Sequence, residues 1–157
     1  MTGFAARKTR LLNRWEARRA GIARPMTAFD RPPEPRTIGL FARGKQLVAG
    51  HVLLAGQMIE TRGETLWAVA PPGSAFGVEA QGFAWLDDLA ALGDSAARIC
   101  AQTWTWDWIA RYGAGRGPGW TPDLAGRRVI RWINHATLLL TAKDAAAEEV
   151  FLRALAR

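Results

Sequence analysis

Residues 94–112, DSAARICAQTWTWDWIARY, decide the fold that we expect for this chain. Small and aromatic residues recur in this stretch at steps of three or four, the spacing that gathers side chains on one face of an α-helix. That face carries Ala97, Ala101, Trp104, Trp108 and Tyr112. Asp94 is expected to cap the start of the helix, because its side chain can accept a hydrogen bond from a backbone amide of the first turn. A ridge of this kind fills the wide gaps between packed helices, so we expect a mainly α fold.

Helices are also predicted on both sides of this stretch. Before it, Phe83, Leu86 and Leu89 repeat at helical spacing, and Gly93 is a typical C-terminal stop. After it, the glycine-rich segment 113–119 is interpreted as a connector. It lacks the Lys-Ser/Thr ending of a phosphate-binding loop and follows a helix rather than a strand.

Thr121-Pro122-Asp123 is the clearest helix start in the chain, since threonine can cap, proline fits the first turn and aspartate favours the positive end. The expected apolar face of this helix comprises Val129, Trp132, Ile133, Ala136, Leu139 and Leu140. Asp144 is expected to cap a last helix, whose predicted buried residues are Val150, Phe151, Leu152 and Leu155. That helix runs to Arg157 without a glycine stop, so we expect the chain to be a truncated part of a longer protein.

The first 30 residues are predicted to form a separate basic helix and linker, followed by a second unit over 31–157. The basic residues of this part are Arg7, Lys8, Arg10, Arg14, Arg18, Arg19 and Arg24. The thin apolar stripe (Phe4, Leu11, Leu12 and Trp15) favours a helix docked by Leu11, Leu12 and Trp15 over one lying on a membrane. Residues 31–35 (RPPEP) are expected to form an extended linker, because proline disfavours helix in the residue before it.

A short β-hairpin is predicted near residues 46–62. β-branched Val48, Val52 and Ile59 alternate there with glycines, and the turn is expected near Gly63.

Composition limits the classes of partner. The formal net charge is +7 and the sequence pI is about 10.9, which is compatible with an acidic polymer, an anionic membrane or nucleic acid. No zinc-finger spacing or aromatic RNA-binding signature accompanies the charge, so nucleic acid is the minority interpretation. The single cysteine, Cys100, excludes an internal disulfide and is expected to be a small core residue. No metal or cofactor is predicted.

Targeting signals are not evident either. No apolar run is long enough for a transmembrane helix, and no secretory signal is visible, so the sequence by itself favours the cytoplasm.

Three blocks, in this order, carry a family resemblance: residues 35–41 (PRTIGLF), 82–89 (GFAWLDDL), and 119–123 (GWTPD) continuing through 126–135 (GRRVIRWINH). Together they resemble the N-terminal region of the bacterial heparinase II/III-like polysaccharide lyases, over roughly residues 35–140. The resemblance implies antiparallel helical hairpins forming part of an incomplete α/α toroid, with the remainder of the toroid and a C-terminal β-sandwich domain as partners. It also implies an acidic polysaccharide substrate, cleaved by β-elimination in the periplasm or cell envelope.

The resemblance implies substrate-binding roles for Arg128, Trp120, Asn134, His135 and Gln81. It assigns no catalytic residue to this chain, because the family's catalytic asparagine, tyrosine and histidine come from later parts of the protein. Two positions depart from the family pattern. Gln81 replaces a frequent histidine and cannot act as a base at neutral pH, and Arg131 replaces a frequent asparagine.

Each candidate also has a structural interpretation. Arg128 could form a salt bridge near its helix start, and Trp132 is expected in the core with Trp120 the more open of the two. Asn134 and His135 point about 100° apart on a helix, which disfavours a shared ligand atom. Asp87-Asp88 are interpreted as a solvated face, and His51 as a strand residue with no role. The chain is therefore expected to be a lyase scaffold that is inactive alone, with a non-catalytic helical module binding an acidic glycan or a protein as the alternative.

Overall fold

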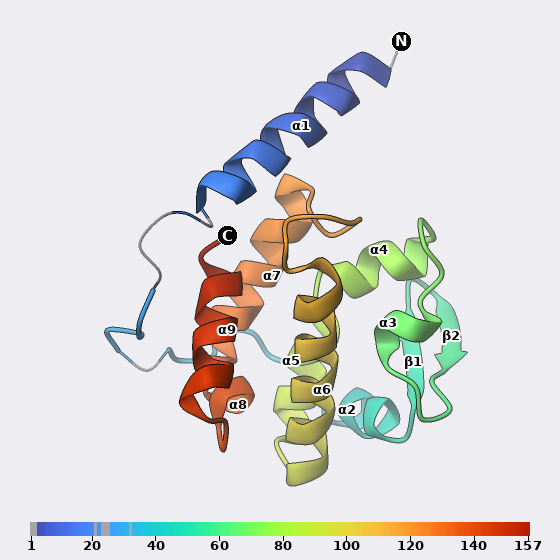
Figure 1. Cartoon of the computed structure of the whole chain (residues 1–157). Coiled ribbons are helices and arrows are strands. Elements are labelled where there is room, and N and C mark those ends of the chain that lie inside the picture. Colours follow the sequence, from blue (N-terminus) through green and yellow to red (C-terminus); the bar gives the residue numbers. More distant parts are fainter. Residues whose placement is uncertain (1–2, 21, 23–25, 32) are drawn as a thin grey trace.

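The computed structural model describes residues 3–20, 22, 26–31 and 33–157 and confirms the mainly α class with one small β-hairpin (Figure 1). Arg24 of the basic run and Pro32 of the linker lie outside the described residues, as do the side chains of Phe4 and Arg10. The elements are α1 Gly3–Ala20, α2 Phe41–Val48, β1 His51–Leu54, β2 Gln57–Glu60, α3 Leu66–Val69, α4 Ala75–Gln81, α5 Ala84–Leu92, α6 Ser95–Tyr112, α7 Pro122–Asn134, α8 Ala136–Leu140 and α9 Ala145–Leu155.

Helix α6 lies at the centre of the helical body and contributes to its core (Figure 1). The predicted ridge is confirmed, since Ala97, Ala101, Trp104 and Trp108 are buried and Tyr112 is half-buried against them. The ring of Trp108 meets that of Trp132 edge-on, with centroids 5.4 Å apart. Edge-to-face contacts of this kind are the favoured packing of aromatic rings, and they join α6 to α7.

The predicted caps and the predicted stop at Gly93 are confirmed, whereas the last helix, expected to run to Arg157, ends at Leu155. The Asp94 side chain accepts a hydrogen bond from the Ala97 amide at 2.7 Å, and the Asp144 side chain accepts one from the Ala147 amide at 2.8 Å. Thr121 caps α7, and Gly93 ends α5 with a left-handed φ of 67°. Each cap satisfies backbone groups that a helix end leaves unpaired.

Two predicted apolar faces are partly wrong. Ile133 is 37% exposed and Val150 is 41% exposed, although Trp132, Phe151 and Leu152 beside them are buried. For Ile133 the reason is that α7 ends at Asn134 and the chain turns at His135, so α8 starts a new direction instead of extending the stripe.

The predicted helix over residues 83–92 begins one residue later. Phe83 adopts the left-handed conformation, with a φ of 62°, and separates α4 from α5. A bulky residue in this region is strained, and complete burial of the Phe83 ring among Trp85, Trp108 and Trp132 holds it there.

The hairpin is shorter than predicted and turns elsewhere. β1 and β2 pair antiparallel with His51 opposite Glu60, and the turn lies at Ala55-Gly56, whose φ angles are 49° and 76°. Two successive positive φ angles are typical of the type I′ hairpin turn. Residues 46–48 belong to α2, so the strand expected there is wrong. Gly44 lets α2 approach α5 closely, because an added Cβ would lie 2.4 Å from the carbonyl oxygen of Asp88.

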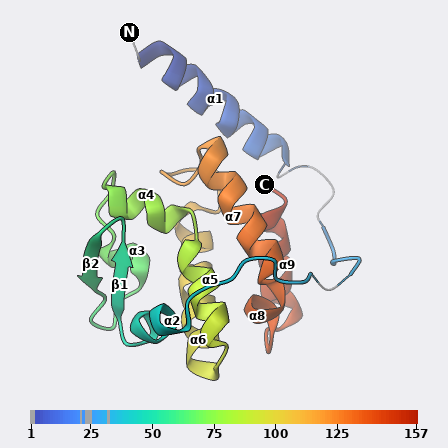
Figure 2. The ribbon, with the colours of Figure 1, turned by 180° about the vertical axis from the view of Figure 1, so that it is seen from behind.

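Helix α1 is confirmed as a helix but is not docked in the expected way. Leu11, Leu12 and Trp15 are 67%, 51% and 54% exposed, so the predicted docking through them is wrong. Figures 1 and 2 show α1 outside the helical body, with its N-terminal end pointing away from it. No helix in the described part of the chain is both long and apolar enough to cross a membrane.

Candidate anion-binding pocket

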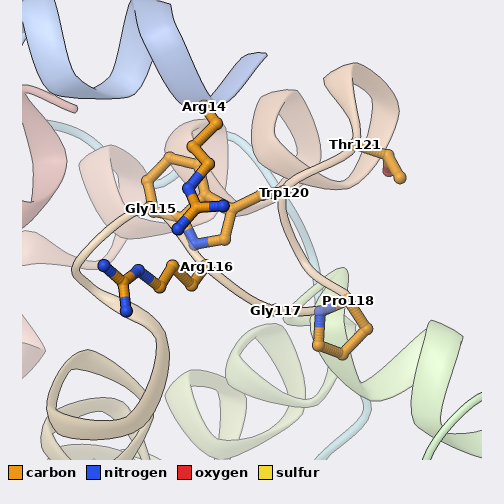
Figure 3. Close-up of a pocket in the computed structure, with 7 residues that line it drawn as sticks. All are labelled: Arg14, Gly115, Arg116, Gly117, Pro118, Trp120 and Thr121. Atoms are coloured by element: carbon orange, nitrogen blue, oxygen red, sulfur yellow. The ribbon is translucent and has the colours of Figure 1, made fainter. Parts of the chain in front are cut away.

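A pocket of about 550 Å³ lies between α1 and the loop that joins α6 to α7 (Figure 3). Its lining consists of Arg14, Gly115, Arg116, Gly117, Pro118, Trp120 and Thr121. Arg14 and Arg116 carry positive charge, and none of the described lining residues is acidic. The volume falls in the range of small-ligand sites, and arginine beside an aromatic ring suits a planar anion such as a carboxylate on a sugar.

The loop under the pocket is fixed at two points. The Trp120 indole Nε1 donates a hydrogen bond to the Tyr112 carbonyl at 2.7 Å, and Arg128 Nη1 donates one to the Gly119 carbonyl at 2.8 Å. An added Cβ at Gly119 would lie 2.2 Å from Gln81 Oε1, so a larger residue there would have to displace the Gln81 amide from its hydrogen bond with Trp108. The predicted connector is therefore a shaped loop that places Trp120 at the pocket.

Arg128 is buried behind Trp120 in a box of indole rings. Its guanidinium carbon lies 4.2 Å from the Trp108 ring centroid, 4.7 Å from that of Trp120 and 5.8 Å from that of Trp132. Arg128 is 3% exposed, and this burial lowers the pKa of its guanidinium to about 10. Cation–π stacking, which strengthens when the cation is desolvated, takes the place of a carboxylate here. The salt bridge considered for Arg128 is not found among the described residues.

Gln81 joins the same cluster. Its buried side-chain oxygen accepts a hydrogen bond from Trp108 Nε1 at 2.6 Å. The structure thus brings together three of the five predicted site residues, Gln81, Trp120 and Arg128, around the ring of Trp108. Of these three, Trp120 lines the pocket, while Gln81 and Arg128 support the loop from below.

The remaining two predicted residues lie elsewhere. Asn134 is half-buried at the end of α7, and neither it nor His135 is among the described residues lining the pocket. His135 is buried, and its Nε2 lies 2.8 Å from Asp87 Oδ1. Their roles as ligand-binding residues stay predictions.

Asp87 is the centre of a buried polar network, which contradicts its interpretation as part of a solvated face. Thr37 Oγ1 donates to Asp87 Oδ1 at 2.7 Å, and Arg131 Nε donates to Asp87 Oδ2 at 2.9 Å. Burial alone would raise the Asp87 pKa. The hydrogen bonds from His135 and Thr37 and the charge of Arg131 outweigh it, so the pKa lies below its ordinary value. The network ties residues 33–40 to α5 and α7.

Arg131 stands where the resembled family often has an asparagine, and its structural partner is Asp87. His51 also has a partner, because its Nδ1 lies 4.0 Å from Glu60 Oε1 across the exposed hairpin.

Cys100 is half-buried against the core, and burial raises its thiol pKa to about 12. Among the described residues, no group of three His, Cys, Asp or Glu side chains could hold a metal ion.

Sequence reasoning missed Arg14 and Arg116 as pocket residues. Arg116 stands four positions before Trp120 in a loop whose path depends on its glycines, and Arg14 comes from a distant helix. A basic residue near a tryptophan in a glycine-rich loop is the one signal that could have indicated Arg116.

No family model matches the chain, and no solved structure matches it. Over 129 residues the chain is 31% identical to FtsZ-localized protein C of Caulobacter vibrioides, an alignment that covers 81% of this chain and 21% of that protein. The chain thus spans about a fifth of the length of the curated relative it matches.

Proposed function

We propose that this chain is the N-terminal scaffold portion of a larger protein built on the plan of the heparinase II/III-like lyases, and that it binds an acidic polysaccharide without cleaving it. The observation that carries the proposal is the pocket, which combines Arg14, Arg116 and Trp120 with no acidic residue in its described lining. Uronic-acid sugars have a flat apolar face for the indole and a carboxylate for the guanidinium.

The helical arrangement supports the scaffold part of the proposal. α5 and α6 are joined by the tight turn at Gly93-Asp94, and α6 and α7 by the loop under the pocket, as in a series of helical hairpins (Figure 1). A toroid would need further hairpins from the remainder of the protein. A C-terminal β-sandwich domain would then supply the other side of the substrate cleft.

The positions of the histidines support a binding role rather than a chemical one. β-Elimination needs a base that can reach the proton at C5 of the sugar. His135 is held in the buried Asp87 network, with 2% of its side chain exposed, and His51 lies on the hairpin away from the described pocket lining. We therefore expect no lyase activity from this chain. Ultraviolet absorbance of unsaturated uronates, measured with the purified chain and a panel of acidic polysaccharides, tests this, and a steady rise would overturn it.

Binding is tested by calorimetry with uronic-acid oligosaccharides and with neutral oligosaccharides of equal length. The full chain should bind the acidic series alone, and added salt should weaken that binding. Arg116→Gln and Trp120→Ala should each weaken it at least about tenfold, the loss of one charged contact or one stacked ring. Arg62→Gln is the matched control, because it removes an exposed arginine that does not line this pocket. Equal binding by the Arg116 and Arg62 variants would overturn the proposal.

A second candidate function is recognition of a protein partner at the place where FtsZ is located. It is favoured by the 31% identity to FtsZ-localized protein C, whose name places that protein with FtsZ. We propose that the protein containing this chain shares that location. A fluorescent fusion of the complete coding region, imaged with labelled FtsZ in the native host, tests it. A band coincident with FtsZ is expected, and a uniform distribution throughout the cell cycle would refute this candidate.

A further inference from the structure

We propose that α1 is a membrane-surface helix that binds anionic lipid headgroups, a role distinct from glycan binding at the pocket, to which this helix contributes Arg14. The first observation is the distribution of charge. Six of the chain's 21 basic residues and one of its 14 acidic residues fall within α1, so this helix carries +5 of the formal net charge of +7. The rest of the chain is nearly neutral, which makes α1 the distinct electrostatic feature of the molecule.

The second observation is that the three large apolar side chains described in α1 are mostly exposed. Leu11, Leu12 and Trp15 are all more than half exposed, on a helix that lies outside the helical body (Figures 1 and 2). Leu11 and Trp15 stand about one turn apart, so they share a face. A soluble helix gains nothing from exposing three such residues together, and a partner that covers them accounts for their presence.

The third observation is how the cations surround these residues. With about 100° of rotation per residue, Arg7, Arg14 and Arg18 fall about 20–60° to one side of Leu11, and Lys8 and Arg19 fall about 60–80° to the other. Glu16 lies further round, about 140° from Leu11. Trp15 and Leu12 lie about 40° and 100° round from Leu11, on the same side as Lys8 and Arg19. Three cations therefore border the apolar stripe at its Leu11 edge, and two stand within it between Trp15 and Leu12.

This arrangement fits a lipid surface. Leucine and tryptophan enter the boundary between headgroups and acyl chains, while arginine stems lie alongside and their guanidinium groups reach the lipid phosphates. Arg19 lies directly beside this stripe, because its guanidinium carbon lies 4.6 Å from the Trp15 ring centroid. Nucleic acid would engage the cations, but it offers no apolar layer for Leu11, Leu12 and Trp15. The observations therefore favour the membrane.

The apolar stripe is narrow, so binding must depend on anionic lipid. The full chain should co-sediment with vesicles of phosphatidylglycerol and phosphatidylcholine, and not with pure phosphatidylcholine vesicles. Arg7→Gln with Arg18→Gln should lower the partition coefficient about fivefold per arginine removed. The control pair Arg62→Gln with Arg153→Gln removes the same charge from other exposed positions and should have a smaller effect.

The apolar contribution is tested by Leu11→Ser with Trp15→Ser, which should reduce vesicle binding more than about tenfold. Ile99→Ser is its control, because Ile99 is an equally exposed apolar residue on α6. Both sets alter exposed side chains, and circular dichroism verifies that they fold. Equal binding by the Leu11/Trp15 variant and the wild type would overturn the proposal. The proposal would also be overturned if the full chain bound no vesicles but bound a DNA duplex, and the Leu11/Trp15 variant still bound that duplex. Those results would assign α1 to nucleic acid.

Discussion

Asp87 and His135, 48 positions apart in the sequence, meet in the interior with 2.8 Å between Asp87 Oδ1 and His135 Nε2. The contact fastens α5 to the turn between α7 and α8, and Thr37 extends it to the segment that leads into α2 and crosses in front of these helices in Figure 2. A buried carboxylate with this many donors is a structural centre, and its loss leaves a buried donor or cation without a partner.

Asp87→Asn is therefore expected to lower the free energy of unfolding by about 3 kcal/mol, because Arg131 and His135 lose a charged acceptor in a site that excludes water. Urea denaturation followed by circular dichroism measures the loss. Asp30→Asn, at an exposed position, is the control and should leave the midpoint nearly unchanged. Comparable midpoints for the two variants would contradict the role of the network.

The same carboxylate makes stability depend on acidity. The Asp87 pKa is lower in the folded chain than its ordinary value of 3.8. As the pH falls, the carboxylate therefore binds a proton in the unfolded state at a higher pH than in the folded state. The stabilisation is complete above about pH 4 and is lost as the pH falls through the folded-state pKa. Thermal denaturation between neutral pH and about pH 3 should show a steeper decline for the wild type than for Asp87→Asn. Parallel curves would contradict it.

Arg128 is expected to stabilise through its planar shape as much as its charge. Arg128→Lys keeps the charge but cannot stack a flat group on both indoles, so it should lose about 2 kcal/mol of unfolding free energy. Arg128→Met, which fills the space without charge, should be more stable than Arg128→Ala by about 1 kcal/mol. Chemical denaturation ranks the variants, and a lysine variant as stable as the wild type would show that stacking contributes nothing.

Gly119→Ala and Gly126→Ala form a matched pair with opposite expected signs. An added Cβ at Gly119 meets Gln81 Oε1, so that variant should lose about 1–3 kcal/mol and displace Trp120. At Gly126, inside α7, an added Cβ meets nothing within 4 Å, so alanine should stabilise by about 0.5–1 kcal/mol. Melting temperatures of the two variants test both signs, and a stable Gly119→Ala would show that the loop is not constrained by Gln81.

Ala55→Asn should stabilise the hairpin. Ala55 has a φ of 49° at the first central position of the turn, where asparagine is favoured ahead of glycine. The expected gain is a few tenths of a kcal/mol, up to about 1 kcal/mol, with no change in the core. Hydrogen exchange of the β1 and β2 amides should slow in this variant, whereas unchanged exchange would indicate that the turn does not limit opening of the hairpin.

Local chemistry was sufficient to predict the main helices of the body and their ends. The caps at Asp94, Thr121 and Asp144 act within one turn of their own positions, and the periodicity of α6 is complete within its own sequence. The mainly α class and the presence of a hairpin follow from such signals, because neither depends on distant residues.

Sequence alone could not place the turn of the hairpin or the helix over residues 41–48. Val48 favours a strand by propensity, and packing of Gly44 and Leu47 against α5 overrides that preference. Likewise, nothing local distinguishes a solvated Asp87 from a buried one. Its partners come from two other segments, residue 37 and the end of α7, and only the packing of those segments removes water from the carboxylate.

The helical stretch 94–112, with its aromatic ridge, was therefore determined by the sequence, because side-chain spacing along one helix fixes which face is apolar. The surroundings of that ridge were decided by tertiary structure. Arg128 meets Trp108 and Trp120, and Arg14 and Arg116 line the same pocket, because segments distant in sequence converge there. Contacts between segments depend on how whole faces pack, and one-dimensional spacing does not contain that information.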